Sequence, residues 1–147
     1  SRQDLPIVTT PEQAEGLAKG AYILSEAEGE LKAILIASGS EISLALEGQR
    51  LLKEQGIATR VVSMPSWELF EQQPEEYRQQ VLPPHVPCRL AIEMAYPMGW
   101  ERYVGSNGDV MGIRHFGASA PGEKLMAEFG FTPEQVVNRV LQLLNKS

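Results

Sequence analysis

Two serines and a glycine form the clearest candidate binding site in the sequence. Ser38, Gly39 and Ser40 follow the aliphatic run at 33–37 and precede a stretch with helical periodicity. Where a strand meets a helix N-terminus, backbone N–H groups and the helix dipole can hold a small anion. The alternative is a capped turn, with Ser38 and Glu41 as a capping box. The pattern favours the capped turn, because the spaced glycines of a dinucleotide site and the lysine of a phosphate loop are both missing.

A second candidate consists of Asp109 and Asn138, which could be mistaken for the pair that holds a metal ion beside a diphosphate. That motif needs a glycine after the Asp, and the chain has Val110 there. It also needs the Asn in a loop, whereas Asn138 lies within a helical pattern. We therefore predict no metal site.

The sequence also contains no convincing set of residues for nucleophilic catalysis. His85 and His115 are the only histidines, and neither has Cys, Asp or Glu at ligand spacing. Ser119, His115 and Asp109 can be combined on paper into a triad, but no Gly-x-Ser-x-Gly turn surrounds a serine. The single cysteine, Cys88, has no disulfide partner, which fits a reducing, cytoplasmic setting. We predict no catalytic residue.

The elements that carry these residues alternate between short aliphatic runs and helical patterns, which is typical of an α/β fold. Strands are expected at 21–24, 33–37, 58–63, 89–93 and 109–113. Helical patterns are expected from Glu41 to Gly56, from about Trp67, over 75–81, around 101–104, and after Thr132 as N-cap. On the first of these helices, one face is expected to carry Ile42, Ala45, Leu46, Gln49 and Leu52. Residues 11–20 read as a polar connecting segment.

Composition limits the partners. The 147 residues include 13 Lys and Arg against 19 Asp and Glu, a net charge of -6 that disfavours nucleic acid and anionic lipid. No apolar run approaches the roughly 18 residues of a membrane-spanning helix. The first residue is not Met, and we expect the chain to be part of a longer protein.

Four stretches resemble transketolase in order and spacing, and together they cover nearly the whole chain. They are residues 1–6, residues 36–41 with 60–70, residues 91–93 with 100 and 103–105, and residues 116–121 with 129–132. The last stretch, with Phe-Gly-Ala-Ser-Ala-Pro, is the most specific. Deoxyxylulose-phosphate synthase and the β part of pyruvate dehydrogenase share the fold. The Phe-Gly-Ala-Ser-Ala-Pro motif and the Ser-Met-Pro motif at 63–65 nevertheless favour transketolase.

The resemblance implies a three-layer α/β/α domain with a five-stranded, mostly parallel sheet whose first strand is antiparallel. It implies a cytoplasmic, homodimeric parent enzyme that moves a two-carbon ketol unit between sugar phosphates in the pentose phosphate pathway. Thiamine diphosphate and a divalent metal, Mg or Ca, would supply the carbon chemistry in the parent. The partners of this domain would be the remaining transketolase domains and the dimer partner.

Arg2 is the one residue to which the resemblance assigns a binding role. It matches the family arginine that binds the sugar phosphate, a task suited to a planar, charged fork of donors. The resemblance assigns the activating glutamate, the sugar-binding histidines and the metal motif to other domains. We therefore expect the chain alone to be inactive and to bind no cofactor. Residues 1–20 are expected to be a linker from the preceding pyrimidine-binding domain, and 21–147 the C-terminal domain.

Three functions remain open. A non-catalytic domain that contacts the rest of the parent should leave an apolar patch uncovered, here at Trp67, Phe70, Trp100 and Tyr103. A regulatory α/β domain would instead hold a small anion at Ser38 to Ser40. An independent enzyme would use Ser119 or His115.

Overall fold

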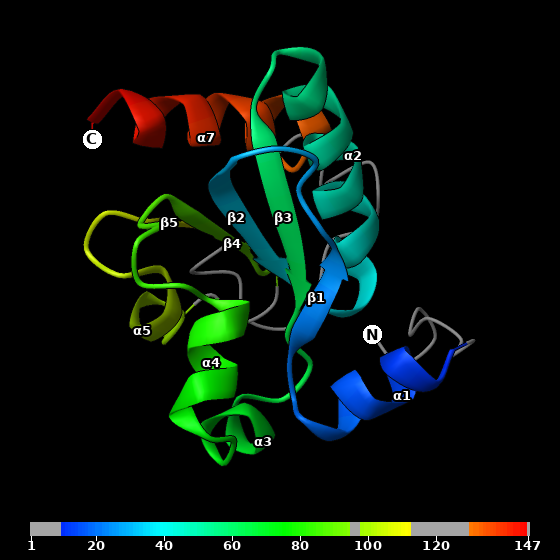
Figure 1. The fold of residues 1–147 in the computed structure, drawn as a ribbon. Coiled ribbons are helices and arrows are strands. Elements are labelled where there is room, and N and C mark those ends of the chain that lie inside the picture. Colours follow the sequence, from blue (N-terminus) through cyan, green and yellow to red (C-terminus); the bar gives the residue numbers. More distant parts are fainter. Residues whose placement is uncertain (1–9, 95–97, 113–129, 147) are drawn as a thin grey trace.

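The computed structural model describes residues 10–94, 98–112 and 130–146. Its centre is a five-stranded sheet in the order β1-β3-β2-β4-β5. The strands are β1 (Tyr22–Ser25), β2 (Leu31–Ala37), β3 (Ala58–Ser63), β4 (Arg89–Ile92) and β5 (Asp109–Met111). Helices cover both faces of this sheet (Figure 1).

Among the described strands, only β1 runs against its neighbour. It pairs antiparallel with β3, with Tyr22 opposite Ser63 and a register shift between Ile23 and Ser25. β2 pairs parallel with both β3 and β4, and β4 pairs parallel with β5. The three-layer fold with a mostly parallel sheet and an antiparallel first strand is therefore confirmed.

The central strand β2 separates two hydrophobic clusters. Its last five residues, Ala33 to Ala37, are fully buried. Because successive side chains of a strand point to opposite faces, Ala33 and Leu35 join one cluster and Ile34 and Ile36 the other. This explains why the strand reads as a continuous apolar run rather than an alternating one.

Two long helices, α2 (Ile42–Glu54) and α7 (Pro133–Lys146), cover one face and also pack on each other. The helices approach closely at Gly48, where an added Cβ atom would lie only 2.6 Å from Cγ1 of Val136. The N-cap predicted for the closing helix is confirmed, since the Gln135 N–H donates to Thr132 Oγ1 at 3.1 Å.

The expected buried face of α2 is partly wrong. Leu46 was assigned to it, but its side chain is 37% exposed, whereas Leu44 is buried. The chain makes a 3₁₀ turn, η2 (Gly39–Glu41), before α2 begins. All residues of the expected face lie within α2, and the packed face is rotated from Leu46 toward Gly48, which is buried but has no apolar side chain to indicate it in the sequence.

Three short helices, α3 (Trp67–Glu71), α4 (Glu75–Val81) and α5 (Glu101–Val104), cover the opposite face. The predicted exposed patch of aromatic residues on this side is wrong for three of its four members, whereas Trp67 is half-buried. Phe70, Trp100 and Tyr103 are only 2%, 2% and 4% exposed. They are buried because the rings pack edge to face, with Trp67 and Trp100 centroids 4.9 Å apart.

The segment expected to be a polar connection forms a helix, α1 (Pro11–Ala18). Thr10 caps this helix, because its side-chain oxygen accepts a hydrogen bond from the Gln13 N–H. Gly16 of α1 is buried directly against the Tyr22 ring of β1. α1 therefore packs on the sheet, and a linker role for residues 1–20 stays a prediction.

Candidate functional site

The turn after β2 lies at the carboxyl edge of the parallel strands. Strand order reverses at β2, because β3 lies on one side of it and β4 on the other, and ligand crevices in α/β sheets form at such points. The capping box expected here is wrong. Ser38 has an extended backbone but makes no side-chain cap hydrogen bond, and the carboxylate of Glu41 accepts from the Ser40 hydroxyl at 3.1 Å instead.

Glu41 gives this edge an acidic character. The residue is only 6% exposed. Burial, with a further contribution from the Glu93 carboxylate that follows β4, raises the pKa of Glu41. An anion held by Ser38, Gly39 and Ser40 would lie beside this carboxyl group. The anion site stays a prediction, and the electrostatics of this edge count against it.

The residues considered for a metal ion or a nucleophile are engaged in structural contacts. Asp109 accepts from Arg139 Nη1 at 2.6 Å and from the Val110 N–H at 2.8 Å. Asn138 lies on α7 and contacts Gln135. Within the described ranges, no three His, Cys, Asp or Glu side chains stand close enough to share a metal ion.

Cys88 is equally unsuited to chemistry. It is buried in the cluster beneath α2 and α7, and burial raises the pKa of its thiol to about 11. The thiol therefore stays protonated at neutral pH and packs as a small hydrophobic group. His85 lies in an exposed turn, while Arg2, His115 and Ser119 lie outside the described residues.

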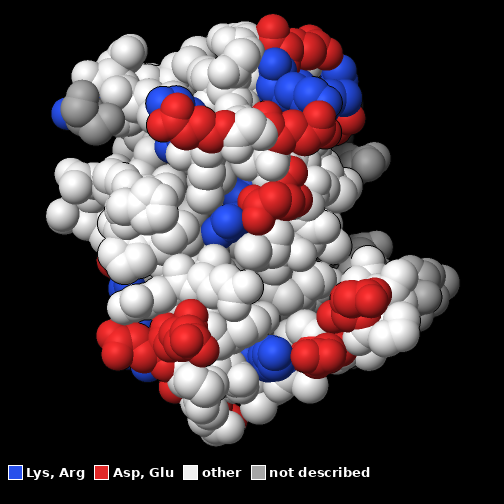
Figure 2. Space-filling view, in the orientation of Figure 1, with Lys and Arg blue, Asp and Glu red and all other residues white. Residues whose placement is uncertain are grey.

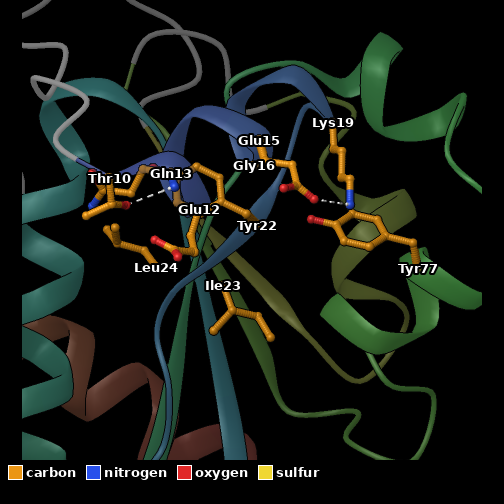
Figure 3. Close-up of a pocket in the computed structure, with 10 residues that line it drawn as sticks. All are labelled: Thr10, Glu12, Gln13, Glu15, Gly16, Lys19, Tyr22, Ile23, Leu24 and Tyr77. Carbon is orange, nitrogen blue, oxygen red and sulfur yellow. Dashed lines mark hydrogen bonds and ion pairs between the residues drawn. The ribbon is translucent and has the colours of Figure 1, made fainter.

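One hollow of about 410 Å³ lies between α1, the edge strand β1 and Tyr77 of α4 (Figure 3). The Lys19 ammonium is 3.4 Å from the Glu15 carboxylate and 4.5 Å from the centroid of the Tyr77 ring. The Tyr77 hydroxyl donates to the Ala21 carbonyl at 2.7 Å. These contacts fix α1 against α4, so we assign this hollow a structural role.

A second hollow, which sequence reasoning missed, lies between α3, α4 and α5 and has a volume of about 310 Å³. We call it the arginine hollow, because Arg78, Arg89 and Arg102 line it, together with Glu71 and Tyr103 among other residues. The three arginines belong to α4, β4 and α5 and are not linked by any local motif. Only the tertiary fold brings them together.

Charge on the rest of the molecule is mixed. On the face drawn in Figure 2, Lys and Arg side chains stand among Asp and Glu and form no continuous basic stripe. No helix within the described residues has the length and apolar character needed to cross a membrane.

The chain forms a three-layer α/β/α domain, because helices cover both faces of a sheet whose first strand is antiparallel and whose other strands are parallel. Residues 20–132 match the family model of the transketolase-like C-terminal domain. The chain therefore belongs to the transketolase family and corresponds to its C-terminal domain.

Curated relatives agree over almost the whole chain. The transketolase of Geobacillus stearothermophilus is 55% identical over 149 residues, which cover 99% of this chain and 22% of the relative. The transketolase of Staphylococcus aureus strain MW2 is 50% identical and covers 97% of this chain and 22% of that protein. The chain thus spans about a fifth of the length of these relatives.

Solved structures give the same result. Transketolase from Pichia stipitis in complex with sedoheptulose 7-phosphate superimposes with a TM-score of 0.80 at 36% identity, over 90% of this chain and 19% of that one. Transketolase from Leishmania mexicana also has a TM-score of 0.80, at 40% identity and with the same coverage.

Proposed function

We propose that this chain is the non-catalytic C-terminal domain of a transketolase, which stabilises the parent enzyme and contacts its other domains and its dimer partner. The parent would be a cytoplasmic homodimer that transfers a two-carbon ketol unit between sugar phosphates. The observation that carries the proposal is the 55% identity over 149 residues to a transketolase of which this segment is only 22%.

Thiamine diphosphate and its divalent metal do not fit the described residues of this domain. The nearest match to the metal motif fails, because Asp109 is bonded to Arg139 and Asn138 projects from α7. The proposal therefore assigns the cofactor and the metal to the other domains and derives no reaction step here. Arg2, which the proposal assigns to the sugar phosphate of the parent, lies outside the described residues.

A domain graft tests the proposal directly. This chain replaces the matching segment of the Geobacillus stearothermophilus transketolase, and ketol transfer from xylulose 5-phosphate to ribose 5-phosphate is measured. We expect the graft to keep activity, because the sheet and both hydrophobic clusters are supplied intact. Deleting the segment should lower both the activity and the temperature of inactivation.

The isolated chain provides the complementary measurement. We expect no ketol transfer and no saturable binding of thiamine diphosphate in the presence of Mg²⁺ by calorimetry. Stoichiometric cofactor binding by the chain alone, or a folded graft without activity, would overturn the proposal. The unmodified relative, prepared in parallel, serves as the control for both assays.

A further inference from the structure

The arginine hollow concentrates positive charge on an acidic protein. Arg78, Arg89 and Arg102 line it against two carboxylates, Glu71 and Glu75. The hollow thus has an excess of one positive charge, three against two, in a chain with a net charge of -6. Such a local reversal of sign attracts small anions from solution.

Two of the three guanidinium groups have no carboxylate partner within the described part of the chain. Arg89 donates to main-chain carbonyls, among them Tyr103 at 2.7 Å and Pro83 at 2.8 Å. Arg102 is exposed, and its guanidinium carbon lies 5.8 Å from the centroid of the Tyr103 ring. No carboxylate of the described ranges therefore neutralises these two charges in an ion pair.

The third arginine has a weak ion pair. Arg78 Nε donates to the Gln73 carbonyl at 3.1 Å, and its Nη1 lies 3.9 Å from Glu71. Glu71 is held by the Tyr103 hydroxyl, which donates to it at 2.7 Å. Burial and Glu71 raise the pKa of Tyr103 to about 12, so the hydroxyl remains a donor at neutral pH. The Nη donors of Arg78 are thus available to a ligand.

We propose that the arginine hollow binds a small molecule that carries a phosphoryl group, with Arg78 and Arg102 as its cationic ligands. A phosphate monoester presents three acceptor oxygens and a charge near minus two, which suits planar guanidinium donors. Arg89, which also lines the hollow, adds positive charge, and Glu71 competes with the ligand for Arg78. The proposal concerns this chain alone and does not depend on transketolase activity.

Calorimetric titration of the whole chain with glycerol 2-phosphate, in phosphate-free buffer of about 0.15 M ionic strength, tests this. We expect saturable millimolar binding that weakens about tenfold in Arg102→Gln and in Arg78→Gln, the factor for one lost charge-assisted hydrogen bond. Glu71→Gln should tighten binding, because it removes the competing carboxylate. General damage to the hollow would weaken binding in all three variants, so a gain in affinity in Glu71→Gln alone would show that Glu71 competes with the ligand.

Matched controls change the net charge of the chain in the same way, but away from the hollow. Arg50→Gln and Glu47→Gln change charge by the same amounts on the exposed surface of α2, where Arg50 pairs with Glu47 at 2.8 Å. Both should bind the ester within about twofold of the unmodified chain, because charges this far away are largely screened. Thermal unfolding of each variant confirms that it is folded.

Three results would overturn the proposal. The first is the absence of saturable binding by the unmodified chain at tens of millimolar ester. The second is an equal loss in Arg50→Gln and Arg102→Gln, which would indicate attraction by net charge alone. The third is acetate binding as tightly as the ester, which would identify the hollow as a contact for protein carboxylates.

Discussion

Arg89 joins three segments of the chain through one side chain. Its guanidinium group donates to the carbonyls of Val86, Tyr103, Leu82 and Pro83, at distances from 2.7 to 3.2 Å. Leu82 is the C-cap of α4, and Tyr103 belongs to the last turn of α5. A cation at these helix ends also interacts favourably with their dipoles.

We expect Arg89→Gln to lower the free energy of unfolding by about 2–4 kcal/mol, because several buried carbonyls lose their donors. Urea denaturation followed by circular dichroism measures the change. Arg50→Gln, on the exposed surface of α2, should leave the midpoint nearly unchanged. Equal effects of the two substitutions would contradict the role assigned to Arg89.

Glu41 makes stability depend on pH. Its pKa in the folded state is raised by burial and by Glu93, so folding favours the protonated carboxyl group. The contribution of Glu41 to stability is therefore fully present below the ordinary glutamate pKa of 4.5 and is lost as pH rises through the raised pKa. Glutamine cannot ionise, so Glu41→Gln avoids this loss.

We expect Glu41→Gln to melt at a higher temperature than the native chain at pH 7, and the difference to shrink as pH falls towards 4. Differential scanning calorimetry across this range measures both effects. A difference that stays constant with pH would show that the carboxyl group is not the cause.

At the scale of elements, the contact between α2 and α7 depends on the missing side chain of Gly48. A Cβ there would lie 2.6 Å from Cγ1 and 3.2 Å from Cβ of Val136. Alanine favours a helix over glycine by up to about 1 kcal/mol, but overpacking costs about 1–3 kcal/mol. The overpacking cost dominates, because a β-branched valine cannot easily rotate within a helix.

Gly48→Ala should therefore lower the free energy of unfolding by about 1 kcal/mol. In a Val136→Ala background the same change should become neutral or stabilising, since the methyl group in its way is gone. A double-mutant cycle in urea gives the coupling. Additive effects would show that the helices are further apart than described.

The sequence predicts the strands well, and most clearly the central one, because residues 33–37 are an aliphatic run buried on both faces. It predicts α7 from Thr132 and Pro133. It misses α1, whose few apolar residues give no periodic signal, although Thr10 and Pro11 mark its start. Local rules do not extend to such a helix, because its stability comes from the contact with β1.

The candidate sites were less predictable than the fold. Ser38 was expected to cap a helix, but a 3₁₀ turn intervenes and Ser40 bonds to Glu41 instead. The arginine hollow gives no signal in the sequence, since Arg78 and Arg102 lie on different helices and meet through the packing around Tyr103. Contacts between residues far apart in the chain depend on tertiary structure, which spacing does not encode.

For the whole molecule, burial of the aromatic residues bears on association. Among the described residues, the exposed large hydrophobic side chains are Leu46, Leu69 and Met98. Leu46 belongs to α2 and Leu69 to α3, on opposite faces of the sheet, so the three side chains do not form one contiguous apolar patch of the kind that drives self-association. Contacts with other domains of a parent would then be largely polar, as is usual between domains.

We expect the isolated chain to sediment as a monomer at micromolar concentrations. Sedimentation velocity over a range of protein concentrations measures this, and Met98→Lys, which adds charge at the most exposed of the three, serves as a comparison. A sedimentation coefficient that rises with concentration, and less so in Met98→Lys, would contradict the expectation.

The reversed direction of β1 determines where the chain enters the sheet. Tyr22, the first residue of β1, lies opposite Ser63, the last residue of β3. The residues that lead from α1 into β1 are thus held at the rim where the parallel strands end, because the Ser66 N–H after β3 donates to the Gly20 carbonyl at 3.0 Å. One inverted strand therefore ties the entrance of the sheet to the exit of its neighbouring strand through a main-chain hydrogen bond.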